Sequence, residues 1–281
     1  MDSASLTDNY VNLLTSFPKL SPNTVLGLFF LTLMRIIPIM VLAPFFGAKN
    51  LPATIRMMFS VALGSILIPS VLMHATPQLD FDWSFVGYSI KELFLGFILG
   101  FFSAVPFYIA QSSGALIDHI RGSSSLQVTD PTTQSQTASM GIFYNLVLIV
   151  VFFLINGPFL FLNAVAESYK IIPVDSFFNM QFFSLKLPIW GVIVGLLDRV
   201  LSIAIQLAAP SLVGILMAEM FLGIANRLAP QVQIVFLGIP LKSWVGIALL
   251  MLAWHFVLQQ LGKESIDWIR VIEKGIRYAK T

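Results

Sequence analysis

The chain has 281 residues, of which 57% are hydrophobic and only 11% are charged, and its formal net charge is +2. A soluble domain has roughly 25% charged residues, so this composition predicts an integral membrane protein or one derived from it. The 25 Phe residues exclude intrinsic disorder, and the small net charge gives no basic surface for nucleic acid. Because the chain has no cysteine, disulfides, thiolate metal sites and cysteine nucleophiles are excluded.

Six apolar runs are candidates for membrane-spanning helices, each of which needs about 20 mostly apolar residues. The runs cover residues 24–46, 57–73, 85–110, 140–166, 187–225 and 232–261. The fifth run is too long for one span, and Pro210 near its middle predicts two shorter helices. We therefore predict a single all-α domain over residues 1–281, a membrane-derived bundle of kinked helical hairpins with six or seven hydrophobic segments.

Basic residues in short loops predict the orientation, because they favour the cytoplasmic side of a membrane. The first loop contains Lys49 and Arg56, and the tail 262–281 contains five Lys and Arg residues, whereas the loop 74–83 contains none. With the first loop and the tail both in the cytoplasm, the number of spans is odd, which favours splitting the fifth run.

The tail also has a helical pattern of its own. Ile266, Ile269, Ile272 and Ile276 follow one another in steps of three or four residues, which predicts an amphipathic helix. Such a helix could lie on the membrane surface, dock a partner or form a solvated last helix.

One polar segment, residues 111–137, interrupts the apolar pattern. It is rich in Ser, Thr, Gln and Gly, it is longer than most loops, and its first half has an apolar stripe of Leu116, Ile117 and Ile120. Small uncharged side chains suit a segment inside a protein-lined aqueous path. A flexible surface loop is the alternative.

No motif in the chain points to catalysis. It has no Walker A sequence, no G-x-G-x-x-G, no H-E-x-x-H and no G-x-S-x-G, and His74, His119 and His255 are far apart. We therefore expect no catalytic residue, no metal site and no cofactor, and an intramembrane enzyme has little support. A secondary transporter of a small solute remains an alternative, although no convincing internal repeat accompanies it.

Charged residues inside the apolar runs are more informative. A charge at mid-bilayer costs at least ~2.5 kcal/mol, so we expect these side chains to face protein or water. Structural ion pairs, a polar conduit and contacts between subunits are the alternatives, and we favour contacts between subunits over a proton relay. Lys91 and Glu92 are adjacent and point about 100° apart on a helix, which predicts separate partners. The charged residues are Arg35, Lys91, Glu92, Asp198, Arg199, Glu219 and Lys242.

Two glycine pairs have the small-xxx-small spacing that lets helices approach closely. They are Gly96 with Gly100 and Gly191 with Gly195. We therefore expect tightly packed hairpins at both places.

The most specific pattern lies in the C-terminal part, AAPSLVGILMAEMFLGIANRLAPQ over residues 208–231 and FLGIPLKS over residues 236–243. With it, the chain resembles the FliR/SctT family of bacterial export-apparatus proteins from about residue 26 to 261. Gln233 departs from the family, which tends to have Asn there. Other positions that carry the resemblance are Arg35, Pro38, Pro44, Pro52, Arg56, Pro69, Lys91, Glu92, Gly96, Gly100, Gln111, Gly114, Asp118, Arg121, Gly122, Asp130 and Pro131.

The resemblance implies a non-enzymatic, multi-pass subunit of a type III secretion export gate in the bacterial inner membrane, within the secretion basal body. The chain is more similar to the SctT proteins of virulence systems than to the FliR proteins of flagellar systems. The implied partners are SctR/FliP-like, SctS/FliQ-like and SctU/FlhB-like subunits, membrane lipid and the unfolded proteins that pass through the gate. In such an assembly the kinked hairpins are largely lifted out of the bilayer plane.

The resemblance further implies that the segment 111–137 plugs the closed channel. The implied plug residues are Gln111, Ser112, Ser113, Gly114, Asp118, Arg121, Gly122, Ser123, Ser124, Ser125, Asp130 and Pro131. The expected assembly residues are the seven intramembrane charges together with Arg227 and Gln231.

Overall fold

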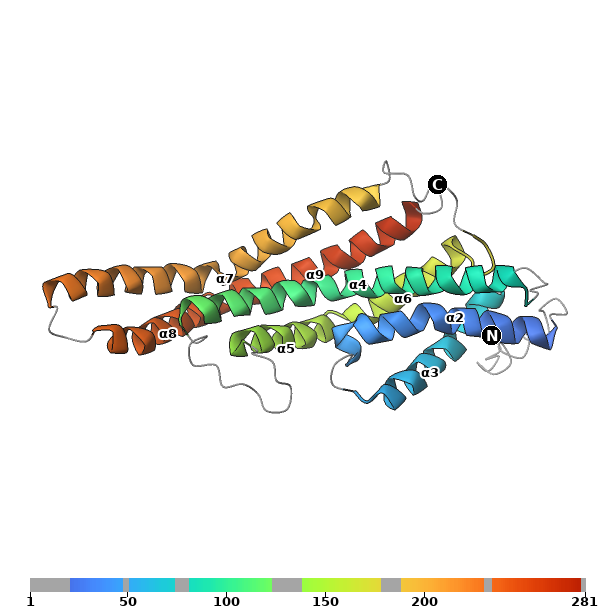
Figure 1. The fold of residues 1–281 in the computed structure, drawn as a ribbon, viewed down its shortest axis with the longest axis horizontal. Helices are drawn as coiled ribbons and strands as arrows, with labels where there is room; N and C mark the ends of the chain where they lie inside the picture. Colours follow the sequence, from blue (N-terminus) through green and yellow to red (C-terminus); the bar gives the residue numbers. More distant parts are fainter. Residues whose placement is uncertain are drawn as a thin grey trace, which may run out of the picture. The chain divides into compact units, whose positions relative to one another are not determined.

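The computed structural model describes residues 21–47, 51–73, 81–122, 138–177, 188–229 and 234–278 (Figure 1). Across these ranges the regular elements are helices, so the predicted all-α fold is confirmed. They are α2 (Pro22–Leu42), η1 (Pro44–Phe46), α3 (Ala53–Leu72), α4 (Trp83–Ile120), α5 (Ser139–Leu154), α6 (Gly157–Ile171), α7 (Pro188–Leu228), α8 (Ile234–Leu252) and α9 (Trp254–Tyr278).

Several helices are long and apolar enough to cross a membrane. Among the described residues four meet this condition, namely α2, α3, α4 and the part of α7 from Gly195 to Leu228. The number rises to six if the broken pairs α5 with α6 and α8 with α9 each count as one span. The protein therefore has the helices of a multi-pass membrane protein.

The chain divides into two compact units. The first unit consists of Met1–Ala104, Pro158–Trp190 and Ile269–Thr281. The second unit consists of Val105–Gly157 and Gly191–Trp268. Both α4 and α9 begin in one unit and end in the other, so these helices connect the units covalently.

In the first unit, α2 and α4 pack with their backbones in contact. A Cβ atom at Gly96 would lie 2.2 Å from the carbonyl oxygen of Arg35, and one at Gly100 would lie 3.1 Å from the Cα of Ile39. The close approach predicted for Gly96 and Gly100 is therefore confirmed. Among the described residues, no atom lies within 4 Å of such a Cβ at Gly195, so the same expectation is wrong for this residue.

The split predicted at Pro210 does not occur, because α7 runs through this residue as one helix. Proline removes one backbone hydrogen bond, which bends a helix without necessarily ending it, and Figure 1 shows α7 changing direction near its middle. The next residue, Ser211, donates a hydrogen bond to the carbonyl oxygen of Gly246 in α8 at 3.0 Å. Packing against α8 thus supports the helix at this point.

Two runs read from the sequence as continuous are broken instead. Residues 140–166 divide at Asn156, which has a φ of +57°, and Pro158 follows at the start of α6. Residues 232–261 divide at Ala253, where α8 and α9 meet with a bend of 66°. Local backbone chemistry at Asn156 and Pro158 explains the first break, whereas no proline or glycine marks the second.

The tail 262–281 is not a separate amphipathic helix as far as it is described, because α9 begins at Trp254 and continues to Tyr278. Ile269, Ile272 and Ile276 are each buried, with 6% or less of their surface exposed. The predicted apolar stripe therefore exists, but it packs within this chain. These three isoleucines are therefore covered by this chain itself.

Candidate functional site

The end of α4 and the start of α5, which precede and follow residues 123–137, are in backbone contact. A Cβ atom at Gly114 would lie 2.3 Å from the carbonyl oxygen of Met140. One at Gly141 would lie 2.9 Å from the carbonyl oxygen of Gln111. Because these neighbours are backbone atoms, they cannot rotate away, and glycine is required at both positions. The helices on either side of residues 123–137 are therefore fixed against each other.

Asp118 connects the two helices through hydrogen bonds. Its Oδ2 accepts a hydrogen bond from the backbone N–H of Met140 at 2.7 Å, and its Oδ1 accepts one from the Arg121 guanidinium. The N-cap residue of α5, Ala138, makes no capping bond of its own. Asp118, which is 2% exposed, therefore supplies the acceptor for the first turn of α5, where the helix dipole also favours a negative charge.

These contacts define a clasp, which consists of Gly114, Asp118, Arg121, Met140 and Gly141. Helix α4 ends next to the clasp in a turn, in which Gly122 adopts the left-handed conformation with a φ of +83°. Glycine adopts this conformation without steric cost. The plug residues expected from the sequence include Gly114, Asp118 and Arg121. They do not include Met140 and Gly141, which follow the polar segment.

The first part of the polar segment is helical, which corrects the prediction of a loop over all of residues 111–137. Residues 111–120 form the end of α4, in agreement with the apolar stripe noted in the sequence. Gln111, Ser112, Ser113, Gly114 and Asp118 lie in this helix, and Arg121 and Gly122 lie in the turn after it. Ser123, Ser124, Ser125, Asp130 and Pro131 lie outside the described residues, as does Gln231.

A second group of predicted residues forms a buried ion cluster in the first unit. Arg35 of α2 binds Glu92 of α4 through two hydrogen bonds, from Nε at 2.5 Å and from a terminal nitrogen at 2.8 Å. The same guanidinium donates to the Ser168 hydroxyl and to the carbonyl oxygen of Ile172, both at 2.9 Å. It also lies over the Tyr169 ring, 4.1 Å from its centroid. The buried charge is therefore surrounded by partners from two helices, α4 and α6, and by Ile172, the residue after α6.

Lys91 belongs to this cluster, so Lys91 and Glu92 have separate partners, as predicted, but they also pair with each other. Its Nζ lies 2.8 Å from a Glu92 carboxylate oxygen. It also donates to the carbonyl oxygens of Pro173 at 2.6 Å and Ser176 at 2.8 Å, in the segment after α6. The Lys91 side chain is long enough to bend toward Glu92. The angle of about 100° between adjacent residues on a helix does not take this length into account.

The charges of the second unit are more exposed. Lys242 of α8 binds Glu219 of α7 at 2.6 Å, and their side chains are 20% and 53% exposed. Arg199 pairs with Glu264 at 3.3 Å, whereas Asp198 and Arg227 are exposed. Large apolar side chains near Glu219 and Lys242 in the sequence are also exposed, namely Met217, Met220, Phe221 and Trp244.

Comparison with known proteins identifies the family of this chain. A sequence model of a family described as "Bacterial export proteins, family 1" matches residues 26–266. The chain belongs to this family. The predicted resemblance to FliR and SctT proteins is thereby confirmed.

Relatives of this export protein come from both virulence and flagellar systems. It is 33% identical over 190 residues to the Yop proteins translocation protein T of Yersinia pestis, covering 65% of this chain and 67% of that protein. It is 28% identical over 197 residues to the secretion system apparatus protein SsaT of Salmonella typhimurium, covering 69% and 72%. It is also 28% identical over 238 residues to the flagellar biosynthetic protein FliR of Bacillus subtilis, covering 84% and 90%.

Family membership and the apolar helices together identify a multi-pass protein of the bacterial inner membrane that belongs to an export apparatus. In the part of the chain that the structure describes, no three His, Asp or Glu side chains are grouped as metal ligands.

Proposed function

We propose that this export protein is a non-enzymatic structural subunit of the type III secretion export gate. In this proposal it assembles with SctR/FliP-like and SctS/FliQ-like subunits into the inner-membrane entrance for unfolded proteins, with an SctU/FlhB-like protein associated. The polar segment 111–137 is the plug that keeps this entrance closed between export events. The energy for export comes from other components, since the chain has no nucleotide-binding motif.

The clasp is the observation that carries the proposal. A plug has to be held at its base, so that it returns to the same position after each export event. Asp118 joins the end of α4, before residues 123–137, to the first turn of α5 after them. Two glycines allow those helices to touch. The polar residues between them are therefore tethered at both ends by packed helices.

The pair of Glu219 and Lys242 supports assembly with other chains. An exposed ion pair among apolar side chains would lose hydration if it faced lipid, at a cost of a few kcal/mol. A protein neighbour with polar groups removes that cost. We therefore assign this part of α7 and α8 to contacts with sister subunits, not to lipid.

The virulence-type gate is the first candidate, because the relative with 33% identity is a Yop translocation protein. A flagellar FliR-type gate is the second candidate. It is favoured by the longer match to the flagellar protein of Bacillus subtilis, which covers 84% of this chain. Complementation of a strain that lacks either protein separates the two, since only the matching system should recover export.

Deletion within the proposed plug tests the function directly. Removing residues 125–134 should make the membrane leak ions and slow growth, while the sister subunits still co-purify with the protein. A variant in which the same residues are scrambled keeps the length and composition, and should leak much less. Unchanged ion permeability in the deletion variant, with the complex assembled, would refute the plug.

Co-purification from native membranes tests the assembly itself. An export-gate subunit should be recovered with its companions in fixed proportions. A secondary transporter would be recovered alone, and that result would refute the proposed function regardless of the plug.

A further inference from the structure

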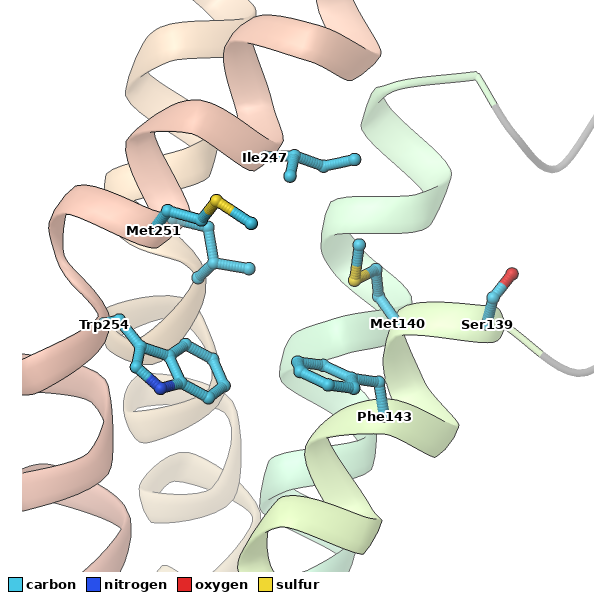
Figure 2. A pocket seen from close by; sticks show the side chains of 7 residues that line it. Ser139, Met140, Phe143, Ile247, Met251 and Trp254 are labelled. Carbon is cyan, nitrogen blue, oxygen red and sulfur yellow. The ribbon is translucent and has the colours of Figure 1, made fainter.

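An apolar cavity of about 450 Å³ lies in the second unit, between the start of α5 and the end of α8. Its volume falls within the range of roughly 300–1,000 Å³ that is typical of ligand pockets. Figure 2 shows the lining side chains facing one another from the two sides. The lining residues are Ser139, Met140, Phe143, Ile247, Leu250, Met251 and Trp254.

The break between α8 and α9 shapes this cavity. The two helices meet at Ala253 with a bend of 66°, and Trp254 is the first residue after it. Its ring stacks against Phe143 of α5 with their centroids 5.5 Å apart and their planes at 30°. Leu250 is only 4% exposed, whereas Phe143 and Met251 are 44% and 73% exposed. The cavity thus has a buried inner wall and an open mouth.

The lining of the cavity is mostly apolar and is suited to a hydrocarbon ligand. None of the seven lining residues is charged, and the Ser139 hydroxyl points away from the space between the two sets of side chains (Figure 2). A charged or polar ligand would lose its hydration here without gaining hydrogen bonds. Apolar cavities bind apolar molecules, which do not need hydrogen-bond partners there.

We propose that this cavity binds one acyl chain of a membrane lipid. The neutral lining is complementary to a neutral hydrocarbon, and the flexible side chains of Met140 and Met251 can adapt to a flexible chain. Exposed apolar residues continue from the mouth along α5, where Leu146 and Val150 are 51% and 59% exposed. A lipid that lies against α5 can therefore insert a chain into the cavity without crossing a polar surface.

An acyl chain suits the cavity better than a side chain of a partner subunit. The mouth is formed by side chains, namely Phe143 and Met251, so a partner's backbone would have to remain outside them. A thin unbranched chain has no such restriction. The proposal does not depend on the plug, because it concerns a part of the chain that is described on both sides of the cavity.

Photolabelling of the full-length protein, purified with any companion subunits, tests this site. The probe is a phospholipid that carries a diazirine in the middle of one acyl chain, and labelled peptides are identified by mass spectrometry. We expect saturable labelling of residues 139–143 and 247–254, which the same phospholipid without the diazirine should compete away. Ile247→Phe fills the cavity and should reduce this labelling at least fivefold.

Two further variants make the result independent of folding defects. Met251→Trp fills the mouth from an exposed position and should reduce labelling to a similar degree. Val213→Phe adds a similar aromatic volume to exposed α7 surface, away from the cavity lining and from the path along α5, and should leave labelling unchanged. Labelling that does not saturate, or that both filled variants retain, would overturn the proposal. So would a photoreactive residue at position 251 that crosslinks to another polypeptide instead of lipid in native membranes.

Discussion

Two ion pairs in this protein join neighbouring helices in opposite surroundings. In the first unit, Arg35 pairs with Glu92, and both side chains are fully buried. In the second unit, Lys242 pairs with Glu219 at a similar distance, but the Glu219 side chain is 53% exposed. The buried pair is part of a cluster whose other partners all belong to this chain. The exposed pair instead retains surface that another chain could contact.

This difference separates charges that hold the fold from charges that are available for assembly. A buried charge without its partner is strongly unfavourable, so the first cluster must form whenever the unit folds. An exposed pair contributes at most about 1 kcal/mol, so folding alone gives little reason for it. The comparison therefore predicts that substitutions in the first cluster impair folding, whereas substitutions in the second pair impair assembly.

The largest effect is expected for Glu92→Ala. It leaves Arg35 and Lys91 buried without their shared carboxylate, which should cost about 3–5 kcal/mol of stability. We expect little folded protein in detergent extracts, measured by size-exclusion chromatography and thermal unfolding. Lys91→Met is the matched control, because it keeps the two hydrogen bonds between Arg35 and Glu92 and should be milder. If Glu92→Ala unfolds at the temperature of the unsubstituted protein, the cluster does not hold the fold.

The sequence identifies all four residues of these two pairs, but it does not show which residue pairs with which. Hydropathy and charge are local properties, so the helices and the intramembrane charges are readable from short windows. Arg35 and Glu92 are 57 residues apart in the sequence, and their contact depends on how α2 packs against α4. The spacing of Gly96 and Gly100 anticipated that packing, whereas the same spacing at Gly195 corresponds to open space.

The second largest effect on stability is expected where α2 packs against α4 at Gly96. Gly96→Ala would bring a Cβ within 2.2 Å of the Arg35 carbonyl oxygen, so α2 and α4 must separate. Overpacking of this kind should cost about 1–3 kcal/mol. Gly223→Ala in α7 is the control, because a Cβ there meets no atom within 4 Å, and alanine should be neutral or slightly stabilising in a helix. Equal thermal unfolding of the two variants would show that the first unit is no more tightly packed than this part of α7.

The clasp could be predicted only in part, for the same physical reason. The family resemblance points to Asp118 as a plug residue, but its bond to the Met140 N–H spans 22 residues. The polar composition predicts a loop from residue 111 onward, yet the helix of α4 continues to Ile120. Contacts with α5, including that of Gly114 with Met140, are available to stabilise this extension. Polar composition alone does not reveal such contacts.

A third, smaller effect is expected for Asp118→Ala, which removes the hydrogen-bond acceptor at the start of α5. Loss of a helix cap typically costs about 0.5–2 kcal/mol. Hydrogen exchange of the Met140 amide should become faster, and ion leak should rise less than in the plug deletion. Asp118→Asn retains a carbonyl oxygen for the Met140 N–H, so its amide should exchange more slowly than in the alanine variant. The bond would have no role if the Met140 amide exchanged at the same rate in all three proteins.

The smallest effect on stability, below about 1 kcal/mol, is expected for Glu219→Ala, because the pair with Lys242 is exposed. The recovery of sister subunits should nevertheless fall, since the polar contact available to a partner is lost. The exchange Glu219→Lys with Lys242→Glu separates the two roles. It keeps an ion pair between α7 and α8 but reverses the charges that a partner would meet. Assembly should therefore remain impaired in the exchanged variant, whereas recovery of normal assembly would mean that the pair acts only within this chain.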